Sequence, residues 1–153
     1  MTPTGSDPLR STLEPRVCGT VLAFDFGARR VGVAVGDLAL GIAHPLETLR
    51  VASDGVRLDE VARLIRDWSP ALLVVGLPSH LNGAKHELSD RCRRFALQLE
   101  RRFGVKVRLV DERLTSRAAA QSLAAAGVRG QRQRQMLDQV AAVHILQTFF
   151  TAR

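Results

Sequence analysis

Cysteine is scarce in this chain of 153 residues. Its two cysteines, Cys18 and Cys92, lie far apart and form no Cys-x-x-Cys pair. A disulfide framework or a structural zinc site built on cysteine is therefore not expected. The same scarcity favours a reducing, cytoplasmic location.

Long apolar runs and the features of a secretion signal are also missing. No stretch approaches the roughly 20 apolar residues that span a bilayer, so we expect no membrane partner. Segment 1–16 is rich in Pro, Thr and Ser and lacks an apolar core, which argues against a secretory signal. We expect a flexible tail over 1–16 and one domain over 17–153, because the length suffices for one substantial core but not for two.

Lysine is nearly absent, whereas arginine is abundant. The chain has 2 lysines and 20 arginines, and its net charge is +7. A basic surface attracts polyanions, and the arginine guanidinium binds phosphate through two parallel hydrogen bonds. The composition therefore favours nucleic acid as a partner, although a basic surface that only aids solubility fits it as well.

The apolar pattern predicts an α/β fold with a mixed five-stranded sheet. The first strand, from Val21, is apolar on both faces, as in the centre of a sheet. Right-handed crossovers would place strands four and five parallel to strand one, giving the order 3-2-1-4-5 and a crevice at the carboxyl ends of strands one and four. The remaining predicted elements are strands at 30–35, 44–49, 71–76 and 107–110 and helices at 56–68, 84–103, 116–126 and 131–150.

An aspartate inside the first strand is the most informative single residue. Asp25 lies between Phe24 and Phe26, and a carboxylate buried there is costly unless a metal ion, a basic neighbour or protonation compensates its charge. Capping does not explain an acid in that position. We therefore expect Asp25 to belong to the crevice.

Two further regions can bring carboxylates to the same crevice. Asp111 and Glu112 follow the last strand, and strand alternation lets at most one of them face the crevice, for which we favour Glu112. Asp138 shares the apolar face of the last predicted helix with Ala142 and Ile145. In the alternative interpretation the helix begins near residue 136, and Asp138 only complements the helix dipole in the first turn.

Converging carboxylates without a His or Cys cluster are hard oxygen ligands and suit Mg²⁺ or Mn²⁺. One or two such ions would support hydrolysis of a phosphodiester bond. The predicted catalytic and metal-binding residues are Asp25, Glu112 and Asp138. Polar and basic residues around the crevice are predicted to hold the substrate: Arg29, Arg30, Ser79, Asn82, Lys85 and Arg113.

Four ordered segments resemble the YqgF/RuvX-type family, small proteins of the RNase H fold related to Holliday-junction resolvases. They are 25–34 with Asp37, 74–78 followed by Asn82-Gly83, 111–115, and 138–142. The resemblance implies a metal-dependent nuclease whose acids match Asp25, Glu112 and Asp138. It also implies maturation of the 5′ end of 16S rRNA, with cleavage of Holliday junctions as the older proposal. Gly36 and the loop 79–86 depart from the usual family pattern.

Three alternatives remain at this point. An actin-like or sugar-kinase ATPase shares the Asp-x-Gly hairpin, but the chain contains no second such hairpin and no internal repeat. A non-catalytic RNA-binding factor would use the same basic surface. A nuclease acting on four-way DNA would suit a symmetric homodimer, since two strands must be cut, and the sequence is compatible with a monomer or a homodimer.

Overall fold

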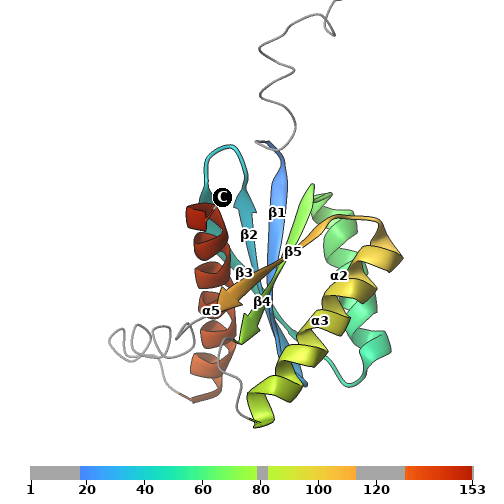
Figure 1. Cartoon of the computed structure of the whole chain (residues 1–153). Coiled ribbons are helices and arrows are strands. Elements are labelled where there is room, and N and C mark those ends of the chain that lie inside the picture. The colour runs from blue at the N-terminus through green and yellow to red at the C-terminus, as the bar shows by residue number, and fades with distance from the viewer. Residues whose placement is uncertain (1–17, 79–82, 113–129, 153) are drawn as a thin grey trace, which may run out of the picture.

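A five-stranded mixed sheet forms the centre of the molecule (Figure 1). The computed structural model describes residues 18–78, 83–112 and 130–152. The strand order β3-β2-β1-β4-β5 confirms the order predicted from the sequence. β2 is antiparallel to β1 and β3, whereas β4 and β5 run parallel to β1. The strands are β1 (Thr20–Phe26), β2 (Arg30–Asp37), β3 (Ile42–Arg50), β4 (Leu72–Pro78) and β5 (Val107–Glu112).

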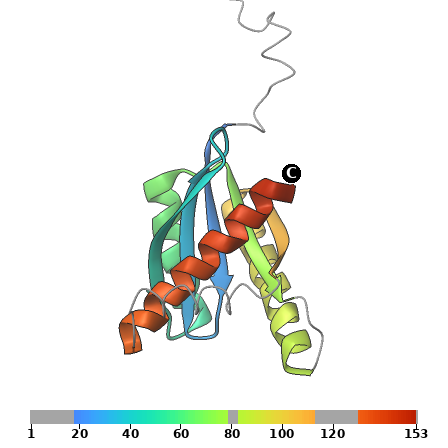
Figure 2. The same ribbon diagram turned by 90° about the vertical axis from the view of Figure 1, so that its left-hand side faces the viewer.

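Helices cover both faces of this sheet. α2 (Asp54–Trp68) and α3 (Gly83–Phe103) lie on one face, and α5 (Gly130–Ala152) crosses the other diagonally (Figure 2). The predicted tail 1–16 and the predicted helix 116–126 lie outside the described residues. In the described part of the chain, no helix combines the length and the apolar character that crossing a bilayer requires.

Alternation along β1 divides the core into two layers. Leu22, Phe24 and Phe26 pack toward α2 and α3, whereas Val21 and Ala23 pack toward α5. Because side chains alternate along a strand, Asp25 falls on the same side as Val21 and Ala23. The apolar pattern that buries β1 thus also sets the acid on the α5 face.

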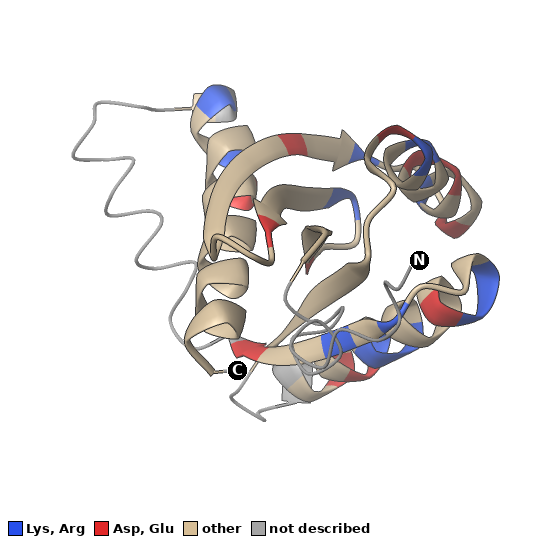
Figure 3. Cartoon of the chain, turned by 90° about the horizontal axis from the view of Figure 1, so that it is seen from above, with Lys and Arg blue, Asp and Glu red and all other residues tan. Residues whose placement is uncertain are grey.

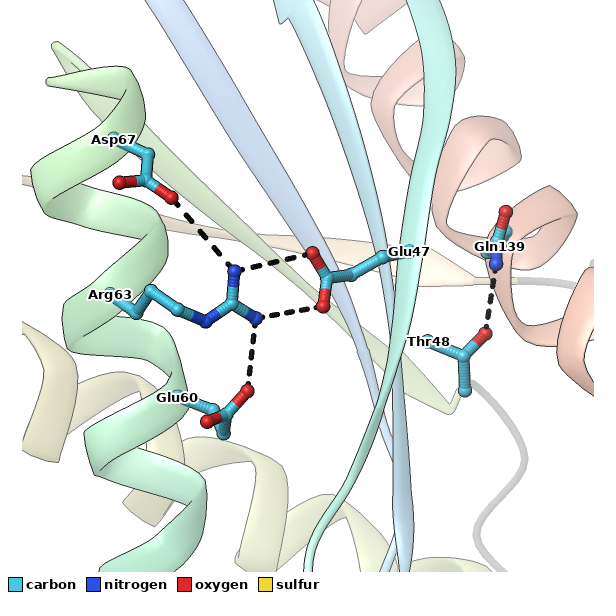
Figure 4. A network of polar contacts seen from close by, with 6 residues as sticks. All are labelled: Glu47, Thr48, Glu60, Arg63, Asp67 and Gln139. Carbon is cyan, nitrogen blue, oxygen red and sulfur yellow. Dashed lines mark hydrogen bonds and ion pairs between the residues drawn. The ribbon is translucent and has the colours of Figure 1, made fainter.

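An ion-pair network joins α2 to β3 (Figure 4). The Arg63 guanidinium donates to both carboxylate oxygens of Glu47 on β3, at 2.8 and 3.5 Å, and to Glu60 of its own helix at 2.9 Å. The hydrogen bonds that Arg63 donates to Glu47 and Glu60 raise the pKa of Arg63. Its side chain is 37% exposed, so solvent screening keeps the contribution to stability modest. The network mainly fixes how α2 lies against β3.

The contact between α5 and β2 depends on glycine. A Cβ atom at Gly32 would lie 1.9 Å from the carbonyl oxygen of Asp138, and one at Gly36 would lie 2.8 Å from the Leu146 side chain. Ala34, between them on the same face, is fully buried beneath α5. The helix backbone therefore rests directly on β2. Gly32 pairs with Asp25 in the β1–β2 register, so this closest approach occurs beside the acid.

Substitution of Gly32 by alanine tests this contact. We expect Gly32→Ala to lower the free energy of unfolding by more than about 2 kcal/mol, because the new methyl group meets helix backbone that cannot yield locally. Gly55→Ala is the matched control. Gly55 lies within α2 and a Cβ there would meet only Ser53 Oγ, at 3.9 Å, so we expect unchanged or slightly higher stability. Equal urea-unfolding midpoints for the two variants would contradict the close contact.

Candidate active site

Asp25 and Asp138 line the same hollow, at the end of the sheet where β1 and β4 finish. The hollow has a volume of about 170 Å³ and is completed by residues 26–30. Asp25 comes from β1, and Asp138 lies in the third turn of α5, which begins at Gly130. The alternative in which Asp138 is a first-turn acid is therefore wrong. Two acids separated by 113 positions in the sequence border one hollow because α5 rests on Gly32.

Asp138 is held by an arginine of the neighbouring strand. Arg30 Nε donates to Asp138 Oδ2 at 2.7 Å, and the Asp138 side chain is only 16% exposed. Burial raises the pKa of Asp138, and the hydrogen bond and charge of Arg30 partly oppose that rise. The guanidinium therefore compensates the buried carboxylate incompletely.

The turn between β1 and β2 is fixed by a buried arginine of α2. Arg57 is 4% exposed, and its Nη2 donates to the carbonyl oxygen of Ala28 at 2.8 Å and more weakly to that of Gly27 at 3.4 Å. Its guanidinium also lies 4.7 Å from the centre of the Phe26 ring and pairs with Asp54. The turn connects Asp25 to Arg30, and both residues line the hollow. Arg57 therefore helps to position these two side chains.

Sequence reasoning missed Arg57, although a signal was present. The buried positions of α2 are Arg57, Val61 and Leu64, a spacing of four and three that is typical of the core face of a helix. The apolar pattern instead suggested Val56, which is 40% exposed. A charged residue at the first position of a buried stripe needs partners, and here the turn carbonyls provide them.

The other predicted site residues have different outcomes. Arg29 is exposed and lines the hollow together with Arg30. Glu112 is the last residue of β5, where its backbone pairs with Pro78, and Lys85 lies in the first turn of α3. The side chains of both are outside the described set. Ser79, Asn82 and Arg113 lie outside the described residues altogether.

Asp37 belongs to a matched motif but lies away from the hollow. Its Oδ1 accepts hydrogen bonds from the backbone N–H groups of Ala39 and Leu40, at 2.8 and 3.0 Å. It pairs with Thr20, the first residue of β1, at the opposite end of the strand from Asp25. Asp37 therefore stabilises the turn that follows β2.

The donors at the hollow fit a hard divalent cation. Carboxylate oxygens are the ligands that Mg²⁺ and Mn²⁺ prefer, and the raised pKa of Asp138 indicates negative charge that its neighbours do not fully compensate. Among the described side chains, no three His, Cys, Asp or Glu residues form a metal-binding group. Two carboxylates of the predicted set thus line one hollow, and the side chain of the third, Glu112, is outside the described set.

Comparisons with known proteins agree with this geometry. A family model described as "RuvX: Holliday junction resolvase" matches residues 19–152. A protein of Methylobacillus flagellatus is 54% identical over 132 residues, covering 86% of this chain and 90% of that protein, and one of Chromobacterium violaceum is 56% identical over 130 residues, covering 84% and 95%. Both carry the name "Putative pre-16S rRNA nuclease".

A solved structure shares the fold at much lower sequence identity. Thermus thermophilus RuvC in complex with a Holliday junction substrate superposes with a TM-score of 0.56 at 17% identity, covering 88% of this chain and 94% of that one. At this identity the likeness establishes the RuvC-like RNase H fold and nothing about the substrate. The fold predicted from the sequence is confirmed.

Replacing Arg57 tests its role in holding the turn. We expect Arg57→Met to lower the free energy of unfolding by about 1–3 kcal/mol, because the carbonyl oxygens of the turn lose their buried donor while much of the packing on Phe26 remains. Arg66→Met is the control, since Arg66 is exposed on the same helix. The measurement is urea unfolding followed by circular dichroism. Equal losses in both variants would show that the turn does not depend on Arg57.

The raised pKa of Asp138 predicts a pH-dependent effect of Asp138→Asn. The folded state binds this proton more tightly than the unfolded state, so the parent loses stability as the pH rises from the ordinary aspartate pKa through the raised one. The asparagine variant lacks this loss. In metal-free buffer we expect its advantage in unfolding free energy to be small near pH 4 and larger at pH 7. An advantage that instead shrinks toward neutral pH would mean that Arg30 outweighs burial.

Proposed function

This chain belongs to the RuvX family, and we propose that it is a metal-dependent nuclease that matures the 5′ end of 16S rRNA from its precursor. The observation that carries the proposal is the meeting of Asp25 and Asp138 in one hollow of a RuvC-like fold. The names of its relatives support precursor rRNA as the substrate. This role implies a cytoplasmic location.

We propose Asp25, Asp138 and Glu112 as the residues that hold Mg²⁺ or Mn²⁺. Alternation along β5 favours Glu112 over Asp111 as the third acid. Position 112 falls on the same face of the sheet as Val110, which packs in the core under α5, whereas Asp111 is exposed. When bound, the cation would lower the pKa of a water molecule and stabilise charge on the phosphate. Among the residues of the chain, Arg30 keeps Asp138 in place and Arg57 fixes the turn beside Asp25.

Basic and polar residues around the hollow are proposed to bind the substrate. Arg29 is exposed at the rim, where a guanidinium can reach a phosphate of the bound strand. Arg30 donates a hydrogen bond to Asp138 through Nε, and its side chain is still 37% exposed. Its terminal nitrogens therefore remain accessible. Ser79, Asn82, Lys85 and Arg113 stay in the proposed set on the strength of the sequence alone.

Cleavage of four-way DNA is the second candidate function. The description of the matching family as a Holliday junction resolvase favours it. Such a reaction cuts two strands symmetrically and so suits a homodimer, whereas cleavage of a single rRNA precursor does not require one. The substrate that is cut therefore distinguishes the two functions, with the oligomeric state as supporting information.

A cleavage assay tests the proposed function. The protein is incubated with Mg²⁺ or Mn²⁺ and a labelled precursor of the 16S rRNA 5′ end, with single-stranded DNA and a four-way junction in parallel. We expect the precursor to be cut only with metal. We expect Asp25→Asn, Glu112→Gln and Asp138→Asn each to reduce cleavage by more than about 100-fold, because each removes a charged oxygen ligand.

The control for that assay is Asp67→Asn, which changes an exposed aspartate near the far end of α2. We expect it to retain parental cleavage. Undiminished cleavage by Asp25→Asn would refute the assigned chemistry. Cleavage of the junction without cleavage of precursor RNA would favour the second candidate, and tight binding without any cleavage would favour a non-catalytic RNA-binding factor.

A further inference from the structure

A second hollow, adjacent to the acidic one, is lined by arginines. Arg30, Arg50 and Arg134, with Gln135, line a space of about 180 Å³ between the end of β3 and the beginning of α5. A larger, open hollow of about 720 Å³ continues from it along Arg29, Arg30, Arg50 and residues 51–52. Arg30 lines both hollows and the acidic one as well. We call the two spaces together the arginine hollow.

The arginine hollow concentrates positive charge, and among the described residues only Arg30 of its lining arginines has an acidic partner. Arg30 and Arg50 are direct partners in the β2–β3 register, and like charges in such a position destabilise a sheet. Arg30 has Asp138 as its counterion. Within the described part of the chain, Arg50 and Arg134 form no ion pair, and no acid lines the hollow. By contrast, acidic and basic segments alternate along α2 and α3 (Figure 3).

Hydrogen bonds hold the two sides of the arginine hollow in place. Thr48 Oγ1 on β3 donates to the carbonyl oxygen of Gln135 at 2.6 Å. It also accepts a hydrogen bond from Gln139 Nε2 at 3.2 Å (Figure 4). These bonds fasten the second and third turns of α5 to β3. The fold itself therefore keeps Arg134 beside Arg50, so the site is already formed before an anion binds.

We infer that the arginine hollow binds backbone phosphates of the nucleic-acid strand beside the bond that is cut. A phosphodiester would relieve the repulsion between Arg30 and Arg50, and exposed guanidinium groups form charge-assisted hydrogen bonds with phosphate oxygens. Arg30 borders the acidic hollow as well as the arginine hollow. A nucleic-acid strand that leaves the acidic hollow would therefore pass over the ends of β2 and β3 toward α5. The inference rests on the proposed function and adds Arg50 and Arg134 to the binding surface.

The test measures binding separately from cleavage. Asp25→Asn serves as the parent, and binding of a fluorescent single-stranded RNA spanning the 16S rRNA 5′ precursor is followed by anisotropy over a range of salt concentrations. Arg50→Ala/Arg134→Ala is introduced into this parent. We expect the dissociation constant to rise at least about tenfold and the slope of log K against log salt to fall by roughly 1.4, since each lost phosphate contact removes about 0.7 for a single strand.

The matched control in the same parent is Arg66→Ala/Arg101→Ala. It removes the same charge from exposed arginines in the last turns of α2 and α3, and we expect less than a threefold change in the dissociation constant. Thermal melting of the Arg50/Arg134 variant should be unchanged or higher than that of its parent, because cross-strand repulsion is removed.

Each outcome of this test decides the inference. Equal weakening in both double variants, or no weakening in the Arg50/Arg134 variant, would overturn the phosphate site while leaving the proposed nuclease intact. Selective weakening would support the site even where the wild-type protein cuts none of the substrates, in which case only the proposed chemistry fails. A parent that binds no RNA at all would overturn both.

Discussion

The backbone contact between α5 and β2 at Gly32 is the constraint on which the candidate site depends. Helices normally pack on a sheet through side chains, which keeps the helix backbone well away from the strands. Here the Asp138 carbonyl occupies the space of a missing Cβ, so a short aspartate side chain on the helix can reach the level of Asp25. A longer distance between the α5 backbone and β2 would hold the carboxylates of Asp25 and Asp138 farther apart.

Arg30 links the acidic hollow to the basic surface beside it. Its Nε holds Asp138, while the rest of the guanidinium borders the arginine hollow. One positively charged side chain can therefore contact two anions, the buried carboxylate of Asp138 and, in the inferred complex, a backbone phosphate. Such sharing is possible because the guanidinium is planar, permanently charged and carries five N–H donors. A lysine at this position would offer one compact charge to only one of these partners.

The sequence predicted most of the fold but only part of the site, and the physical reasons differ. Burial of β1 and β4 on both faces produces uninterrupted apolar runs, so sheet order and strand direction followed from pattern and handedness. The helix predicted over 131–150 agrees with α5, although residues 130–135 are polar and carry no apolar period, which is why a start near residue 136 was the alternative. The spacing of the buried stripe of α2 indicated Arg57, but the turn carbonyls that it contacts come from a distant segment, which a local pattern does not reveal. Gly36 looked like a departure from the family, yet α5 packs against it.

Charge and burial oppose each other at Asp138, which distinguishes this acid from Asp37. Asp37 is half-buried, accepts two backbone hydrogen bonds and completes a turn, so its carboxylate is stabilised within its own turn. Asp138 is buried against a single arginine, and its pKa is raised despite that partner. Folding alone would favour an uncharged residue there. A carboxylate kept at a cost to folding, in the same small hollow as Asp25, is what the proposed cation site requires, because a bound cation would stabilise the folded state.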